Sequence, residues 1–308
     1  YDGAMVTLCA NIATAYINLR TWQTQYMVAM WHIQSQKEIL NMVENRFKSG
    51  LASMFDVSQS RTLFLSTQAS VAPLMANIES QINSIAILLG VYRDKLPQSL
   101  YTVTKLPNIN TLIPVGVPMD LLRRRPDIKE AEYNLASYAA EIGIAKKEFL
   151  PTLSLNGGIG FKSGKIGDIF NDDSFNYTVS PTLSWTIFDG LSRKYNLIET
   201  KEQFQIGIDN YNNTVMNAVK EVQNSMIVYK YKLIEANEAV KVKEESYRSL
   251  EYAIDLYKKG LTAHTDVLTA QQTYLEYNNS LVVSQGDALL ATISIYQALG
   301  GGWNNIEY

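Results

Sequence analysis

The stretch "YTVSPTLSWTIF", residues 177–188, decides what kind of fold this chain can adopt. Every second position is apolar, namely Tyr177, Val179, Pro181, Leu183, Trp185 and Ile187. The positions between them carry hydroxyls, namely Thr178, Ser180, Thr182, Ser184 and Thr186. Because side chains alternate across a strand, this pattern predicts a strand with one oily face and one hydroxyl-lined face. Its length is close to the roughly 9–11 residues that a tilted strand needs to cross a bilayer.

A partner strand precedes it in "LPTLSLNGGIGFK", residues 150–162, and a polar, glycine-bearing loop joins the two. Leu153, Leu155, Ile159 and Phe161 alternate there with polar or small residues. The pair predicts a β-hairpin over 153–188. A lone hairpin is marginally stable, and its edges would be unpaired in lipid, so several chains would have to close the sheet. The alternative is a hairpin that packs its oily face on helices.

The rest of the chain has the pattern of long helices. From Leu191 to Lys259 there is no proline and a single glycine, Gly207. Apolar residues recur in alternating steps of four and three, with one interruption at Lys243. They are Phe204, Ile208, Tyr211, Val215, Val219, Val222, Met226, Tyr229, Leu233, Ala236, Val240, Tyr247, Leu250, Ile254 and Tyr257. A sustained heptad predicts a left-handed coiled coil. A short turn at Gly260 and a second helix over 266–299 predict an antiparallel helical hairpin.

The same hairpin occurs twice. Asn45–Gly90 aligns with Asp255–Gly300 without a gap, at a constant offset of 210. The identical positions are Lys48, Gly50, Leu51, Asp56, Val57, Leu65, Ser70, Ser84, Ile85, Leu89 and Gly90. We infer a tandem duplication. Because the first copy lacks the strands and the rising helix of the second, we expect the chain to begin inside its first long helix.

These patterns divide the chain into six predicted segments. They are a helical hairpin at 1–90, a linker at 91–118, a rising helix at 119–152, the β-hairpin at 153–188, a second helical hairpin at 189–299 and a tail at 300–308.

Composition excludes several classes of function. The net charge of −3 gives no support for nucleic-acid binding, and the single cysteine excludes an intramolecular disulfide framework. No phosphate loop or nucleophile motif is present, and His32 and His264 have no partner at metal-ligand spacing. We therefore predict no catalytic, cofactor or metal site, and no enzymatic activity.

Several motifs resemble the TolC family of outer-membrane efflux ducts, in particular its lipoprotein branch. They are "RRRPDI" at 123–128, "FLPTLSL" at 149–155, "SPTLSWTIFDGLSRKYN" at 180–196, the two "KxGLxxxxDV" turns and "ALGGGW" at 298–303. The resemblance covers essentially the whole chain. It implies a homotrimer in which each protomer gives four strands to a shared twelve-stranded β-barrel, with long helices forming a tunnel through the periplasm.

The resemblance also implies a role and a location. The protein would be the passive exit duct of a tripartite efflux system in the outer membrane of a Gram-negative bacterium, reached by a periplasmic adaptor protein and an inner-membrane pump. The lipid-facing residues would be Tyr177, Val179, Leu183, Trp185 and Ile187. The alternative is a soluble periplasmic coiled-coil adaptor or scaffold.

Candidate gate residues follow the two turns. Asp56 and Asp266 occupy equivalent helix starts, where they are expected to act as N-caps, with Gln59 completing a capping box at Asp56. Six such carboxylates in a trimer would also form a cation-attracting constriction. By resemblance, Tyr257 matches a tyrosine of the periplasmic gate. The family often has an arginine at the position of Thr262 and an aspartate at that of Thr269, and this chain has neither.

Gly50, Leu51, Gly260 and Leu261 match the tips that meet the adaptor in the family. Their alternative role is a helix C-cap with its hydrophobic contact.

Overall fold

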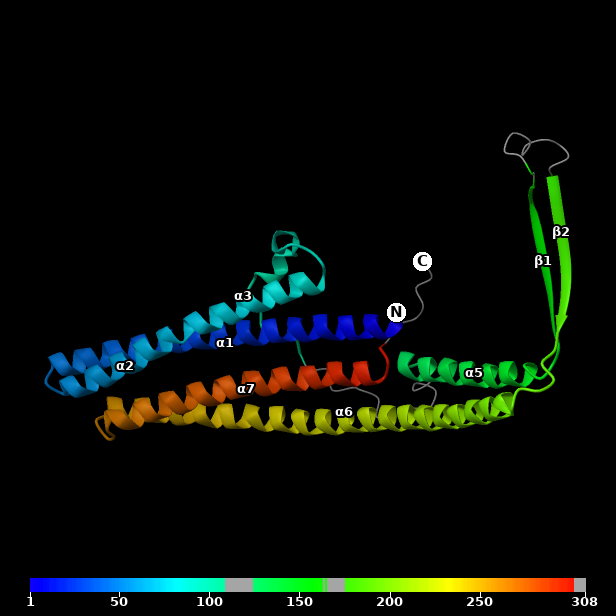
Figure 1. Cartoon of the computed structure of the whole chain (residues 1–308). Coiled ribbons are helices and arrows are strands. Elements are labelled where there is room, and N and C mark those ends of the chain that lie inside the picture. The colour runs from blue at the N-terminus through cyan, green and yellow to red at the C-terminus, as the bar shows by residue number, and fades with distance from the viewer. Residues whose placement is uncertain (109–123, 163, 165–174, 302–308) are drawn as a thin grey trace. The chain divides into compact units, whose positions relative to one another are not determined.

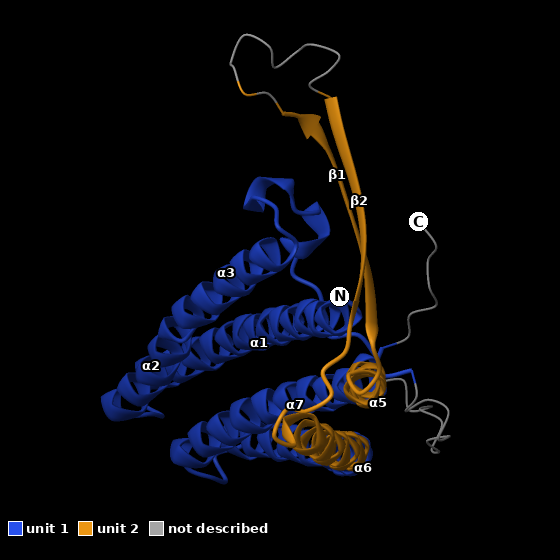
Figure 2. Cartoon of the chain, turned by 45° about the vertical axis from the view of Figure 1, so that its right-hand side comes forward, with its two compact units in different colours: residues 1–126, 217–308 blue, residues 127–216 orange. Residues whose placement is uncertain are grey.

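The computed structural model describes residues 1–108, 124–162, 164 and 175–301. The chain is mainly helical, with one long antiparallel strand pair, as Figure 1 shows. The prediction of a mainly α-helical chain with a β-hairpin is therefore confirmed. The chain forms two compact units, residues 1–126 with 217–308 and residues 127–216, which Figure 2 distinguishes by colour. In the described part of the chain, no helix carries an apolar stretch long enough to cross a membrane.

The first unit consists of two helical hairpins. The first hairpin joins α1 (Asp2–Lys48) to α2 (Met54–Ala69), which α3 (Val71–Leu88) follows after a short break. The second hairpin joins α6 (Ser192–Lys258), which enters this unit at Asn217, to α7 (His264–Ala298). Helix α1 packs against α2, α3 and α7, so it connects the two hairpins.

The duplication read from the sequence is present in the structure. Helices α1 and α6 end at Lys48 and Lys258, and the helices that follow begin at Met54 and His264, so both pairs keep the offset of 210. Gly50 and Gly260 both have φ of 73°. This left-handed conformation is strained for residues with a Cβ and closes a helix at low energy only with glycine. The two turns are therefore copies of one motif.

The predicted heptad seam of α6 faces its partner helix. In the first unit, the seam residues Val222, Tyr229, Ala236, Leu250 and Tyr257 are all buried. Tyr229 packs with Ala291 and Ile295 of α7, and Leu250 packs with Ala270 and Tyr274. Tyr247 lies at the edge of the seam, and Tyr296, which continues the seven-residue pattern of α7, is exposed. The antiparallel packing is therefore confirmed over most of its length.

The segment after α3 folds back onto α1. It contains two single-turn helices, η1 (Arg93–Lys95) and η2 (Gln98–Leu100). The buried guanidinium of Arg20 donates hydrogen bonds to the Ser99 and Thr102 carbonyls and to the Thr104 hydroxyl. These hydrogen bonds hold the described part of the linker predicted at 91–118 against α1. Residues 109–118 of this linker lie outside the described residues.

The second unit contains α5 (Pro126–Lys147) from Asp127 onward, β1 (Thr152–Phe161), β2 (Phe175–Ser184) and the first part of α6. Helix α5 ends at Lys147, five residues before the end of the rising helix predicted over 119–152. Residues 119–123 lie outside the described residues. The helix stops before Pro151 because proline disfavours helical backbone at the residue that precedes it. Helices α5 and α6 approach closely at Gly207, where an added Cβ would lie 2.7 Å from the Tyr138 ring.

Candidate functional site

The strand pair separates oily from polar side chains as predicted. Strands β1 and β2 run antiparallel, and residues directly opposite each other share a face. One face holds the pairs Leu153–Leu183, Leu155–Pro181, Gly157–Val179, Ile159–Tyr177 and Phe161–Phe175. The opposite face holds Ser154–Thr182, Asn156–Ser180, Gly158–Thr178 and Gly160–Asn176. Tyr177, Val179 and Leu183 are 64–74 % exposed, so their apolar face has no cover within the described chain.

The strand is shorter than predicted. Strand β2 ends at Ser184, so Trp185 and Ile187 follow the strand rather than belong to it. Thr152 and Ser184 form the last pair, and the residue that precedes β1 is Pro151, which has no N–H to extend the ladder. Trp185 instead donates from its indole nitrogen to the Phe149 carbonyl at 3.2 Å. The lipid-facing assignment for Trp185 and Ile187 therefore cannot rest on strand alternation.

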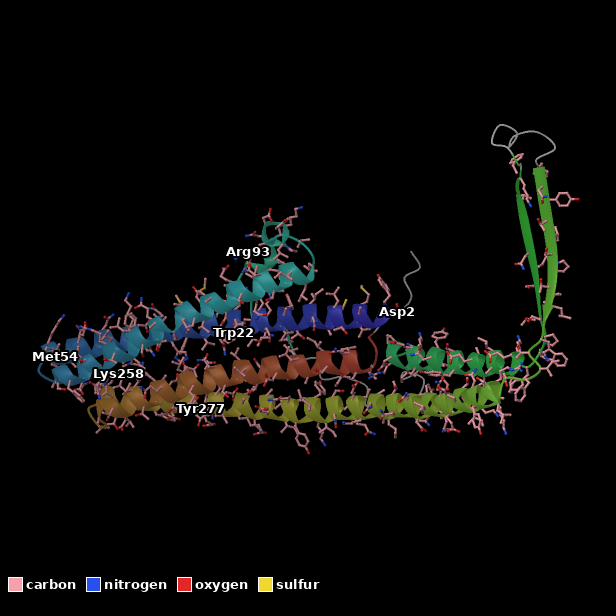
Figure 3. All side chains as sticks on the ribbon, in the orientation of Figure 1. Asp2, Trp22, Met54, Arg93, Lys258 and Tyr277 are labelled. Carbon is pink, nitrogen blue, oxygen red and sulfur yellow. The ribbon has the colours of Figure 1, made fainter. Side chains whose placement is uncertain are left out.

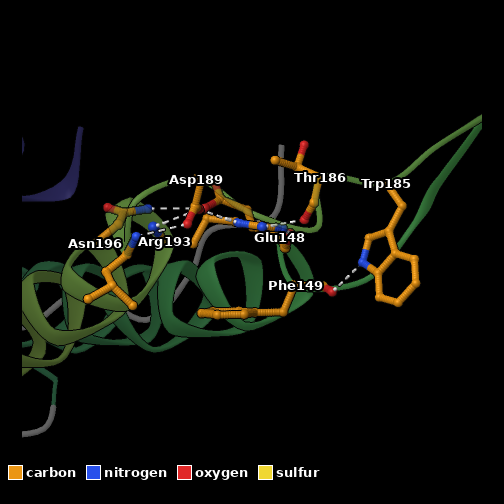
Figure 4. A network of polar contacts seen from close by, with 8 residues as sticks. Glu148, Phe149, Trp185, Thr186, Asp189, Arg193 and Asn196 are labelled. Carbon is orange, nitrogen blue, oxygen red and sulfur yellow. Dashed lines mark hydrogen bonds and ion pairs between the residues drawn. The ribbon is translucent and has the colours of Figure 1, made fainter.

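A polar cluster joins the strands to the helices, and sequence reasoning missed it. Figure 4 shows this junction cluster, which comprises Glu148, Phe149, Thr186, Asp189, Arg193 and Asn196. The Asp189 carboxylate accepts hydrogen bonds from the Leu191 and Arg193 backbone at 3.1 Å and from the Arg193 guanidinium. Arg193 lowers the pKa of Asp189 below its ordinary value.

The Arg193 guanidinium also donates to two backbone carbonyls, that of Glu148 at 2.9 Å and that of Thr186. These carbonyls belong to the segments that enter and leave the strand pair. The available sequence signal was "DGLSR" at 189–193, where Gly190 and Leu191 both adopt positive φ before the helix.

Asp56 does not cap its helix in the predicted way. The N-cap of α2 is Ser53, and Asp56 is the third helical residue of a reciprocal capping box. The Asp56 carboxylate accepts from the Ser53 backbone N–H at 2.9 Å, and the Ser53 hydroxyl accepts from the Asp56 N–H at 3.2 Å. The prediction that Asp56 is an N-cap with Gln59 is therefore wrong, because the helix begins earlier, at Met54.

Asp266 occupies the equivalent position in α7. The N-cap there is Ala263, which has no side chain that can accept a hydrogen bond, so Asp266 is not an N-cap either. Its carboxylate accepts from the Thr262 hydroxyl. Both carboxylates lie in the first turn of a helix, where the helix dipole favours negative charge.

Tyr257 lies buried beside the turn of the second hairpin. It belongs to a buried hydrophobic cluster that includes Val43 of α1 and Val57 of α2, so this cluster spans both helices of the first hairpin. The Arg46 guanidinium lies 4.6 Å from the centre of its ring. Burial raises the pKa of Tyr257, the charge of Asp56 adds to this effect, and Arg46 opposes it. The structure thus brings Tyr257 within electrostatic reach of Asp56.

His264 and Ser60 form a contact that the sequence did not reveal. The imidazole of His264, the first residue of α7, lies 2.7 Å from the Ser60 hydroxyl of α2, and both side chains are buried. Their separation of 204 residues explains why no local pattern predicted the pair. No group of three metal-binding side chains occurs among the residues that the structure describes.

The turns themselves present apolar side chains to solvent. Leu51 and Leu261 are 66 % and 70 % exposed. Figure 3 shows Met54 and Lys258 beside these turns. A shallow groove of about 480 Å³ reaches the first turn and is lined by Glu38, Asn41, Met42, Asn45, Arg46, Ser49 and Leu51.

The described chain thus combines tandem helical hairpins that have matching turns with a strand pair that is oily on one face and hydroxyl-lined on the other. The chain belongs to the outer membrane efflux protein family, whose model matches residues 1–91 and 117–301.

Named relatives agree with this assignment. The chain is 31 % identical over 310 aligned positions to the toluene efflux pump outer membrane protein TtgI of Pseudomonas putida, covering 97 % of this chain and 63 % of TtgI. It is 28 % identical to the cation efflux system protein CusC of Escherichia coli O6:H1, covering 97 % of this chain and 64 % of CusC. The chain thus spans less than two thirds of the length of these relatives.

Solved structures show the same fold. The outer-membrane channel OprN superposes with a TM-score of 0.87 at 30 % identity, over 98 % of this chain and 68 % of OprN. A structure of CusC superposes with a TM-score of 0.83 at 25 % identity, over 98 % of this chain and 70 % of that chain.

Proposed function

We propose that the whole protein is the passive outer-membrane exit duct of a tripartite efflux system, and that it has no enzymatic activity. The observation that carries this proposal is the strand pair: a membrane-crossing length, one exposed oily face and one hydroxyl-lined face, in a chain that belongs to the outer membrane efflux protein family. This family favours the duct over the alternative of a soluble periplasmic adaptor or scaffold, because adaptors are a different component of such systems.

The assembly that we propose is a homotrimer with a twelve-stranded barrel. Each strand of an isolated pair leaves one edge without hydrogen-bond partners, and lipid cannot satisfy those backbone groups. Neighbouring strands therefore have to complete the ladder. With four strands from each of three protomers, the oily residues Tyr177, Val179 and Leu183 would face lipid, and Thr178, Ser180 and Thr182 would face water.

The proposed partners are a periplasmic adaptor and an inner-membrane pump. The exposed tips at Gly50–Leu51 and Gly260–Leu261 would contact the adaptor, since matching turns would present two equivalent apolar contacts per protomer. TtgI is named for toluene and CusC for cations. We propose small molecules as the transported class, and expect the pump to select among them because the duct supplies no energy.

The proposed periplasmic gate comprises Asp56, Asp266 and Tyr257. Two first-turn carboxylates per protomer would place six negative charges around the axis of a trimer, which would attract cations. The buried cluster that Tyr257 shares with residues of both helices of the first hairpin supports a role in holding the second hairpin closed.

Single-channel recording of the full-length protein in a planar bilayer tests this proposal. We expect stable, cation-preferring channels whose selectivity falls in the Asp56→Asn/Asp266→Asn variant. Asparagine keeps a side-chain oxygen for the capping box, so charge changes with little change in helix stability. Asp94→Asn/Asp209→Asn, which removes two exposed carboxylates elsewhere, is the matched control. Unchanged selectivity would keep the duct and reject the charged gate, whereas a folded, soluble monomer without channels would overturn the duct.

A further inference from the structure

We propose that the Ser60–His264 hydrogen bond is a latch that holds the second helical hairpin against the first, and that acidification releases it. His264 is then a positioning residue for the periplasmic gate. This inference rests on the proposed function, because it names a control of the same gate.

The geometry supports a latch because the bond joins the two hairpins at their tips. Ser60 belongs to α2 of the first hairpin, and His264 begins α7 of the second. The Oγ···Nε2 distance of 2.7 Å is that of a well-formed hydrogen bond, and each residue is 4 % exposed. Separating the hairpins would break this bond and expose both groups to water.

The latch is absent from the internal duplication. An offset of 210 places Met54 opposite His264 and Ala270 opposite Ser60. This pair of apolar side chains cannot form the equivalent hydrogen bond. The turns and helix ends of the two hairpins are copies, but the hydrogen bond between Ser60 and His264 has no counterpart at the repeated positions.

The surroundings of His264 disfavour a positive charge while the latch is closed. The imidazole packs on the Tyr257 ring of α6, with 5.3 Å between ring centres, and α1 brings the Arg46 cation to that same ring. A first-turn position also places a histidine cation at the positive end of the helix dipole. The Nδ1 atom is buried and makes no hydrogen bond of normal geometry within the described residues.

Two carboxylates act in the opposite direction. Asp56 of α2 favours the charged imidazole through its charge and its backbone, and Asp266 follows two residues later on α7. The effect of burial is larger than that of Asp56, so the pKa of His264 is lowered from its ordinary value of 6.5.

The direction of the pH effect follows from this balance. His264 is neutral with the tips closed at neutral pH. Separated tips expose the imidazole, whose pKa then returns to about 6.5. Protons therefore bind the separated state better, and closure weakens as the pH falls below about 6.5. The periplasmic location of the proposed gate would expose it to the pH of the surroundings.

Single-channel recording at pH 7.5 and pH 5.5 tests the latch with three variants of the full-length protein. We expect the open probability of the wild type to rise at least about threefold on acidification. His264→Gln retains an amide able to bond Ser60 but does not titrate, so its response should be flat. Ser60→Ala should be more open than the wild type at pH 7.5. Ser58→Ala, an exposed serine two residues away on the same helix, should match the wild type.

A second measurement reads the separation of the hairpins without relying on conduction. Spin labels on Leu51→Cys and Leu261→Cys, in a Cys9→Ala background and in spin-diluted trimers, report the distance between the two tips within one chain. We expect longer or broader distances at pH 5.5 than at pH 7.5, an unchanged distribution in His264→Gln, and a retained response in His32→Phe.

These measurements separate failure of the latch from failure of the duct. Channels whose opening ignores pH, or an acid response that survives in His264→Gln, would overturn the latch and keep the duct. Tip separation that depends on pH and on His264 in a protein that never conducts would keep the latch and count against the duct.

Discussion

Arg193 and Asp189 form an ion pair, with 2.5 Å between Nε and Oδ2, at the step from the strand pair into α6. The same guanidinium reaches the carbonyls of Glu148 and Thr186, which lie on either side of the strands. One side chain therefore fixes both ends of the hairpin to the start of a long helix. In the barrel that we propose, this contact would set the direction in which the hairpin leaves the helices.

Replacing Arg193 by lysine should loosen this junction. A lysine ammonium cannot match the planar guanidinium that spans Asp189 and two carbonyls. We expect a smaller fraction of the proposed trimers to survive stepwise heating, measured by gel electrophoresis. Arg248→Lys, which alters an exposed pair with Glu245, is the control and should behave as the wild type. Asp189 has a lowered pKa, so its contribution should be intact above about pH 4 and lost at lower pH.

Arg125 should contribute far more to the stability of the fold than its neighbour Arg124. The buried Arg125 guanidinium donates to the Ala298 carbonyl at 2.6 Å and pairs with Glu221 at 2.7 Å, so it ties the end of α7 to α6. We expect Arg125→Ala to lower the free energy of unfolding by about 2–3 kcal/mol. Arg124 is exposed, and Arg124→Ala should change the free energy of unfolding by less than about 0.5 kcal/mol. Thermal unfolding followed by circular dichroism compares the two, and equal effects would contradict the assigned role.

His32 should make the packing of α1 against α7 sensitive to acid. Burial against Trp31 and Tyr274 lowers its pKa from 6.5 to about 4. A lowered histidine pKa means that the unfolded chain binds the proton first. Stability is therefore complete above pH 6.5 and falls as the pH drops toward 4, by roughly 3 kcal/mol.

His32→Phe keeps a ring in this position and removes the titration. The difference in unfolding midpoint between the wild type and His32→Phe, measured from pH 7.5 to pH 4, isolates this histidine from the carboxylates. A difference that stays constant with pH would show that His32 does not contribute to the acid response.

A positive charge should have different effects on the two faces of the hairpin. Val179→Arg places a cation on the oily face and should impair outer-membrane insertion, at roughly 2–4 kcal/mol if the site lies near the bilayer centre. Thr178→Arg, one residue away on the hydroxyl face, should insert normally and change conductance instead. Membrane fractionation and single-channel recording measure the two effects, and equal insertion of both variants would argue for a hairpin that does not meet lipid.

Glycines in α5 and α6 offer a test of close helix packing. At Gly207 an added Cβ would lie 2.7 Å from the Tyr138 ring, whereas at Gly143 it would meet open space. Gly207→Ala should destabilise the protein by about 1 kcal/mol, because overpacking outweighs the gain in helix propensity. Gly143→Ala should stabilise it by up to about 1 kcal/mol. Chemical denaturation compares the two directly.

Local and periodic features were predictable from the sequence. The left-handed glycines and the heptad seam depend on residues a few positions apart, and the repeat is visible by comparing two stretches of the same sequence. The structure confirms each of these features. Several predictions about helix and strand ends were wrong, including the N-cap roles of Asp56 and Asp266. Asp56 is the third residue of a capping box begun by Ser53, and β2 ends before Trp185 because Pro151 cannot extend the ladder.

The long helices and the strand pair with faces of different polarity were predictable because each follows from a repeat of 3.5 or 2 residues along one element. The duplicated turn was predictable because the same residues recur 210 positions later in the chain. Which distant side chains meet depends instead on how the helices pack. Ser60 and His264, or Arg125 and Ala298, lie far apart in sequence, and each pair forms only after whole helices have packed. Their energies come from burial and hydrogen-bond geometry, which no stretch of sequence contains on its own.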